Sequence, residues 1–176
     1  MQTVLDKDFV PFLSANEIDE KINGLAQQLN TDYEGQNPLF ISVLNGSFMF
    51  SSDLFKHLTI PAEICFIKLA SYKGTKSTGH VITAIGLDVD ITNRHIIILE
   101  DIIDTGKTLS QFLPQITNQQ PASVKIAVLL HKPEATVHRF PIDYCCFSIP
   151  NKFVVGYGLD YDGYGRNIPE ILQLAD

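Results

Sequence analysis

The sequence predicts an α/β protein with a mainly parallel sheet flanked by helices. Short apolar runs alternate along the chain with segments of helical periodicity, a pattern typical of strands joined by crossover helices. One run, residues 94–100, is apolar on both faces, as expected of a central parallel strand. The length of 176 residues suits a single domain, since such a chain buries roughly two-thirds of its unfolded surface.

The first third of the chain predicts two helices and two strands. Residues 15–30 carry apolar side chains at helical spacing, which indicates an amphipathic helix. Residues 38–46 are a short apolar run closed by Asn-Gly, which predicts a buried strand ending in a tight turn. A second helix follows over residues 47–58, and a second strand over residues 62–72.

The middle of the chain begins with a polar segment. Residues 73–80 contain two glycines and no apolar anchor, which predicts an exposed, mobile loop. Residues 80–87 and 94–100 then form two strands. The spacing of four apolar residues marks the next helix: Leu109, Phe112, Leu113 and Ile116. Pro114 lies inside that pattern and should kink or shorten the helix.

The last third predicts three strands. Residues 123–132 and 143–149 are apolar runs, and residues 152–171 pass from a strand into a turn rich in Gly and Tyr. In a parallel α/β sheet, ligands bind beyond the carboxyl ends of the strands. The carboxylates and glycines of this chain fall at those ends.

Charge and cysteine content exclude several classes of protein. Thirteen basic and twenty acidic side chains give a net charge of -7, which argues against a broad nucleic-acid-binding surface. The three cysteines show no disulfide framework or zinc spacing and indicate a reducing compartment. The N-terminus has no secretory pattern, and no apolar stretch reaches the roughly 18 residues of a membrane span. We expect a cytoplasmic protein that binds neither nucleic acid nor membranes.

The most informative segment is residues 100–108, Glu-Asp-Ile-Ile-Asp-Thr-Gly-Lys-Thr. A P-loop is excluded, because its pattern needs a glycine five positions before Gly106, where Asp101 stands. A loop that opens a helix still presents free N–H groups and the positive end of the helix dipole to an anion. The hydroxyls of Thr105 and Thr108 add further donors for a monophosphate.

Two acids just upstream suggest a second part of the ligand. Carboxylates such as Glu100 and Asp101 accept hydrogen bonds from a vicinal diol or bind Mg²⁺. Together with the phosphate loop they describe a site for ribose 5-phosphate. An ordinary helix start with solvated acids is the alternative.

This segment is similar to the phosphoribosyl-pyrophosphate motif of the type I phosphoribosyltransferases, in the form closest to their hypoxanthine-guanine branch. Four further stretches resemble, in order, that family's pyrophosphate loop, mobile catalytic loop, purine-side lysine segment and purine and metal segment: residues 42–54, 69–79, 129–135 and 151–171. The resemblance spans about residues 38–171. It implies the family fold, with a core over about residues 38–150 and a small hood built from the N-terminal segment and about residues 151–176.

The resemblance also implies site residues. Ribose and phosphate would be bound by the central motif: Glu100, Asp101, Ile102, Ile103, Asp104, Thr105, Gly106, Lys107 and Thr108. Pyrophosphate would be bound by Asn45, which stands where this branch often carries lysine, and by Gly46, Ser71, Tyr72 and Arg166. The purine would be bound by Lys132, Lys152, Phe153, Val154 and Asp160. The Mg²⁺ cofactor would be bound by Glu100, Asp101 and Asp160.

Four of these residues have specific implied roles, each with a plain structural alternative. Asp104 matches the general base facing purine N7, or it caps the following helix. Lys132 matches the lysine that reaches the purine 6-oxo group, or it is a solvated charge. Phe153 matches the ring that stacks on the purine, or it packs in the core. Asp160 matches a magnesium ligand, or it is a turn residue.

The implied activity is purine salvage. The enzyme would transfer phosphoribosyl from phosphoribosyl pyrophosphate to hypoxanthine, and also to guanine, giving IMP or GMP and pyrophosphate. Family members form homo-oligomers, dimers or tetramers. Two alternatives stay open: a xanthine-preferring enzyme, and a regulatory, nucleotide-sensing protein of this family that binds RNA. The sequence does not rank hypoxanthine, guanine and xanthine.

Overall fold

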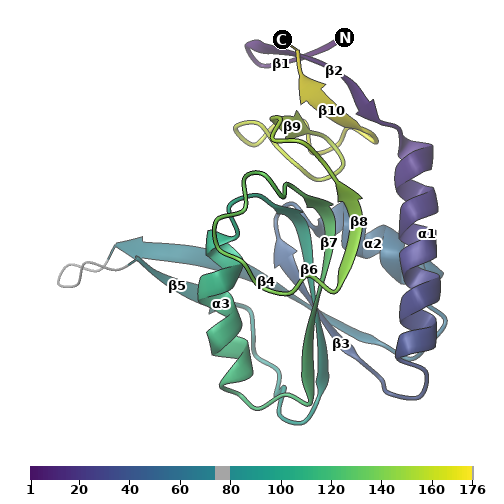
Figure 1. The fold of residues 1–176 in the computed structure, drawn as a ribbon, viewed down its shortest axis with the longest axis vertical. Coiled ribbons are helices and arrows are strands. Elements are labelled where there is room, and N and C mark those ends of the chain that lie inside the picture. The colour runs from purple at the N-terminus through teal and green to yellow at the C-terminus, as the bar shows by residue number, and fades with distance from the viewer. Residues whose placement is uncertain (74–79, 176) are drawn as a thin grey trace.

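A computed structural model describes residues 1–73 and 80–175, and of residues 70–73 and 80–84 the backbone alone. A six-stranded sheet forms the body of the molecule in the order β5-β4-β3-β6-β7-β8 (Figure 1). Its strands are β3 (Leu39–Leu44), β4 (Glu63–Lys73), β5 (His80–Ile85), β6 (His95–Ile103), β7 (Ser123–His131) and β8 (Tyr144–Ser148). Five run parallel, and β5 pairs antiparallel with β4 at the edge, which confirms the predicted fold class.

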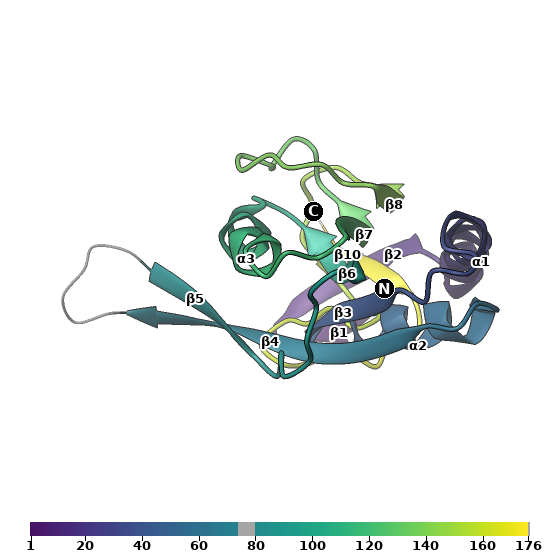
Figure 2. The same cartoon turned by 90° about the horizontal axis from the view of Figure 1, so that it is seen from below.

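Helices cover both faces of this sheet. They are α1 (Ala15–Asp32), α2 (Phe48–His57) and α3 (Lys107–Thr117). Figure 2 shows α3 on one side of the sheet, and α1 and α2 on the other. Successive side chains of the central strand β6 point alternately to the two faces of the sheet. Ile97 packs with α1 and α2, whereas Ile96 and Ile98 pack with α3. The continuous apolar run in β6 therefore reflects burial on both faces.

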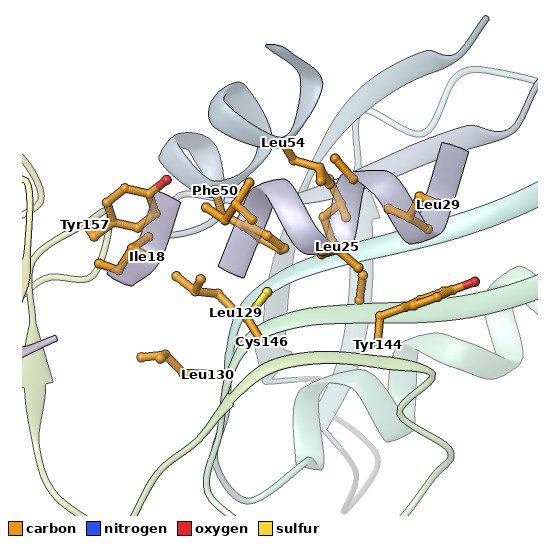
Figure 3. Packing of buried hydrophobic residues seen from close by; sticks show 14 of the residues in the cluster. Ile18, Leu25, Leu29, Phe50, Leu54, Leu129, Leu130, Tyr144, Cys146 and Tyr157 are labelled. Atoms are coloured by element: carbon orange, nitrogen blue, oxygen red, sulfur yellow. The ribbon is translucent and has the colours of Figure 1, made fainter. Parts of the chain in front are cut away.

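The larger core lies between the sheet and the α1–α2 pair. In Figure 3, Leu25 and Leu29 of α1 lie close to Leu54 of α2 and to Tyr144 of β8. Helix α1 begins with a capping box, in which Glu17 N–H donates to Ser14 Oγ and Ser14 N–H donates to Glu17 Oε2. The cap and the apolar stripe together place α1 along the sheet.

A second, smaller sheet stands at one end of the molecule. Its antiparallel strands lie in the order β1-β2-β10-β9, and both chain termini lie there (Figure 1). They are β1 (Gln2–Val4), β2 (Lys7–Leu13), β9 (Val154–Val155) and β10 (Ile171–Leu174). Phe9, Val155 and Leu172 form its core. Sequence patterns predict none of β1, β2 and β10 as strands. β1 and β10 have only three and four residues and carry little periodicity, and in the seven residues of β2 only Phe9 is buried.

Three further features qualify the sequence predictions. Strand β6 continues past Glu100 to Ile103, because Ile102 and Ile103 pair with β7. Pro114 does not end α3, which continues to Thr117. The predicted mobile loop falls largely on residues 74–79, which lie outside the described residues. Within the described part of the chain, no helix combines the length and apolar character needed to cross a membrane.

Candidate active site

A cavity of about 300 Å³ opens at the carboxyl ends of β3 and β6. It is lined by Val43, Leu44, Leu69 and the whole of residues 100–109. The residues of the central motif therefore border one space at the carboxyl ends of the parallel strands, where ligands bind in such folds.

The phosphate-type loop of the motif leads directly into α3. Gly106 is the N-cap of this helix, with φ +77°, and a Cβ at this position would collide with His138 O. Gly106 has no side chain to cap the first turn, and the Thr105 hydroxyl oxygen accepts from Lys107 N–H at 3.4 Å instead. The Asp104 carboxylate pairs with Lys132, so Asp104 does not have the capping role. Thr105, Lys107 and Thr108 are exposed around this helix start, which suits it to bind an anion.

The two acids upstream of the loop lie deep in the sheet. Glu100 is only 9% exposed, and Asp101 Oδ1 accepts a hydrogen bond from Ile102 N–H at 2.9 Å. Burial raises the pKa of both carboxyl groups, most strongly that of Glu100, which also faces the charge of Asp101. A divalent cation would relieve this repulsion, and carboxylate oxygens are ligands that Mg²⁺ prefers. The pair therefore fits a magnesium ion by its chemistry.

The Asn-Gly turn after β3 borders the same cavity. The Leu44–Asn45 peptide is cis. Gly46 is buried, and a Cβ there would fall on Asp101 Oδ2. A glycine at this position therefore allows the turn to lie against the acid pair.

A chain of buried hydroxyls stabilises this turn from behind. Ser42 Oγ lies 2.7 Å from both Ser47 Oγ and Ser51 Oγ, and the Ser47 hydroxyl donates to Val43 O. Sequence reasoning missed this cluster. The serines at the end of β3 and the start of α2 were its only signal.

Asp104 and Lys132 lie side by side at the ends of β6 and β7. Lys132 Nζ is 3.4 Å from Asp104 Oδ2, and the lysine side chain is 7% exposed whereas the aspartate side chain is 50% exposed. The backbone N–H of Lys132 donates to Ile103 O at 2.9 Å. Lys132 is therefore not a solvated charge. The pair places a carboxylate and an ammonium next to each other at the carboxyl ends of β6 and β7.

Phe153 directly precedes β9 of the second sheet. Its side chain is 43% exposed, so it is not core packing. The ring centroid lies 5.8 Å from that of Tyr161, in an edge-on arrangement. Val154 is buried in β9, and Lys152 lies in the loop before it, with its N–H donating to Pro150 O. The ring centroid of Phe9 in β2 lies 6.1 Å from that of Phe153, so Phe153 has two aromatic neighbours and still leaves part of its surface exposed.

Asp160 and Arg166 form an ion pair in the Gly/Tyr-rich segment. Arg166 Nη2 is 2.7 Å from Asp160 Oδ1, and Nη1 donates to Gly158 O at 2.7 Å. The Arg166 charge acts to lower the pKa of Asp101, against the burial that raises it. The structure does not gather Asp160 with Glu100 into one metal site. Among the residues described, no group of three or more His, Cys, Asp or Glu could hold an ion.

The two remaining predicted residues lie in β4. Ser71 pairs with Ile82 of β5, and Tyr72 with Val81. The side chains of both residues lie outside the described part of the structure.

Comparison with known proteins points to one family. Residues 14–162 match the family model described as a phosphoribosyl transferase domain. The hypoxanthine-guanine phosphoribosyltransferase of Streptococcus pneumoniae is 44% identical over 175 residues, which cover 98% of this chain and 97% of the relative. That of Streptococcus thermophilus is 42% identical over the same shares.

Solved structures give the same result. The crystal structure of a hypoxanthine phosphoribosyltransferase from Staphylococcus aureus has a TM-score of 0.89 at 36% identity, covering 99% of this chain and 96% of that one. A hypoxanthine-guanine phosphoribosyltransferase from Bacillus anthracis has a TM-score of 0.86 at 34% identity, covering 97% of this chain and 99% of that one.

Proposed function

Because this chain belongs to the phosphoribosyl transferase family, we propose that it transfers the phosphoribosyl group of phosphoribosyl pyrophosphate to hypoxanthine and guanine. The products are IMP or GMP and pyrophosphate, a purine salvage reaction. The observation that carries this proposal is the pairing of Asp104 with the buried Lys132 beside a helix start suited to phosphate.

The central motif would hold the ribose 5-phosphate. The phosphate would accept hydrogen bonds from the start of α3 and from the hydroxyls of Thr105 and Thr108. Ile102 and Ile103 keep the strand paired with β7 up to the loop, so that the acids and the phosphate groups keep a fixed separation. Glu100 and Asp101 would face the ribose hydroxyls.

Asp104 and Lys132 would act on the purine. A carboxylate that faces N7 takes up the proton that leaves the base as the glycosidic bond forms. An ammonium donates to the 6-oxo group of hypoxanthine or guanine and meets the 6-amino group of adenine unfavourably. This pair thus supplies both proton transfer and base selection.

The second sheet would act as a hood over the base. The exposed ring of Phe153 can stack on the purine face, and the backbone at Val154 can meet its edge. Lys152 and Asp160 lie at the two ends of the segment that carries them. A cavity of about 540 Å³ is lined by Phe153 and Asp160, which leaves open space beside the ring for a ligand.

Arg166 would bind pyrophosphate together with the turn at Asn45 and Gly46. The guanidinium is fixed by Gly158 O and Asp160, and it offers charge to an anion near Asp101. Ser71 and Tyr72 are assigned to the same pyrophosphate by resemblance.

Mg²⁺ would be held by Glu100 and Asp101. Bound there, it would neutralise the departing pyrophosphate. Asp160 as a third ligand is a prediction at odds with its ion pair to Arg166. Homo-oligomer formation and a cytoplasmic location also stay predictions.

A single panel tests the proposed activity. Hypoxanthine, guanine, xanthine, adenine and uracil are each mixed with phosphoribosyl pyrophosphate, with and without Mg²⁺, and base consumption is followed by ultraviolet absorbance. We expect turnover of hypoxanthine and guanine that depends on Mg²⁺. Preference for xanthine would change the assigned substrate, and no turnover of any purine would overturn the enzyme assignment in favour of a regulatory protein.

A further inference from the structure

The hydroxyl of Thr136 bridges the two residues assigned to the purine. Thr136 lies in the loop after β7, and its Oγ1 is 2.8 Å from Asp104 O and 2.9 Å from Lys132 O. On its other side, His131 Nε2 is 3.1 Å from the same oxygen. One side chain thus contacts the backbone of both Asp104 and Lys132.

The number of hydrogens available in this cluster determines which group donates to which. A threonine hydroxyl has one hydrogen to donate, which the two carbonyl oxygens share, and lone pairs with which it accepts. His131 completes the cluster when its Nε2 carries the proton and donates to Thr136 Oγ1. Burial lowers the pKa of the His131 imidazole, which favours the neutral ring with a single N–H.

Backbone hydrogen bonds join the same two loops directly after Thr136. The N–H groups of Val137 and His138 donate to Thr105 O at 3.1 and 2.9 Å. Behind the loop, a cavity of about 340 Å³ lies between His131 and Phe140. These hydrogen bonds hold the loop against the central motif, together with the close approach of His138 O to Gly106.

We propose that Thr136 is a positioning residue for the purine, which sets the separation of Asp104 and Lys132. This inference rests on the roles proposed for those two residues. The hydroxyl touches neither the Asp104 carboxylate nor the Lys132 ammonium. It holds the peptide groups from which both side chains extend, and small errors in such placement cost rate steeply.

The test compares Thr136→Val, which keeps the shape and removes the hydroxyl, with Thr136→Ser, which keeps the hydroxyl. We expect Thr136→Val to lower kcat/KM for hypoxanthine about ten-fold while KM for phosphoribosyl pyrophosphate changes less than about two-fold. Thr136→Ser should restore kcat/KM to within about two-fold of wild type. Thr117→Val is the matched control, since the Thr117 hydroxyl donates to two carbonyl oxygens of α3, away from the cavity.

Three results would overturn this inference. The first is wild-type kinetics in Thr136→Val, and the second is an equal loss towards both substrates that tracks a lower melting temperature. The third is a ten-fold loss of kcat/KM for hypoxanthine in Thr136→Ser, which would show that the methyl group of Thr136, not its hydroxyl, is responsible. This result can be obtained even when Thr136→Val does not fold. Turnover of hypoxanthine by the wild-type protein is measured in the same experiment. Its absence would contradict the proposed function, whereas the comparison of variants tests only the role of Thr136.

Discussion

Lys132 Nζ lies 3.4 Å from Asp104 Oδ2, although 28 positions separate the two residues in the chain. Strands β6 and β7 bring them together, because Ile103 pairs with His131 and each residue of the ion pair follows directly. The lysine is buried, so its ammonium depends on this carboxylate for a partner. The parallel register of the two strands thus determines that these two side chains lie together at the carboxyl ends of β6 and β7.

Replacing Asp104 by Asn should separate catalysis from binding. The amide keeps the size of the carboxylate but cannot take up a proton, so we expect kcat to fall by about 10²–10⁴. Affinity for phosphoribosyl pyrophosphate, measured by calorimetry, should change little because the loop backbone is retained. Asp88→Asn, at an exposed carboxylate, is the control. Wild-type kcat in Asp104→Asn would contradict the general-base assignment.

Replacing Lys132 by Ala should weaken the choice between oxo and amino purines. The variant lacks the ammonium that donates to the 6-oxo group, so we expect kcat/KM for hypoxanthine to fall at least about ten-fold. The ratio of hypoxanthine to adenine turnover should fall with it. Lys125→Ala removes a lysine whose salt bridge to Asp143 lies on the surface. An unchanged ratio in Lys132→Ala would show that selectivity arises elsewhere.

Gly158→Ala tests the contact between the hood and the turn after β3. Gly158 has φ +96°, and a Cβ would collide with Gly46 O, so we expect a loss of about 1–3 kcal/mol in the free energy of unfolding. Gly163→Ala is the control, since φ is +86° there but no atom lies within 4 Å of the added Cβ. Equal losses in the two variants, measured by urea denaturation, would show that backbone strain alone is responsible.

The capping box of α1 predicts a pH-dependent contribution to stability. Hydrogen bonds from the Ser14 hydroxyl and its backbone N–H lower the pKa of Glu17 from its ordinary value of 4.5. The carboxylate therefore stabilises the fold above pH 4.5, and this contribution is lost as the pH falls through the lower pKa of the folded state.

Melting temperatures of wild type and Glu17→Gln should converge as the pH falls from about 6 to about 3. Glu20→Gln, on the same helix, is the control. Ser14→Ala should cost about 1 kcal/mol at neutral pH. A gap between wild type and Glu17→Gln that stays constant with pH would refute the role of the ionised carboxylate.

Much of the parallel sheet could be predicted because its signals are local. The apolar run of β6 and the spacing in α1 each report burial within a few consecutive residues. The small antiparallel sheet gave a weaker signal, since β1 and β10 are short and β10 pairs with β2 from the opposite end of the chain. Pro114 predicts a kinked or shortened α3; the helix continues to Thr117, with Leu109, Phe112 and Ile116 buried on its apolar face.

By itself, the sequence determined the fold class and the chemistry available around residues 100–108, because strand periodicity and a loop opening a helix depend on neighbours along the chain. Only the tertiary structure decided which groups face one another. It paired Lys132 with Asp104, set Gly46 against Asp101, and joined Asp160 to Arg166 rather than to the other acids. These relationships follow from strand register and the placement of the hood, which arise from packing between distant segments.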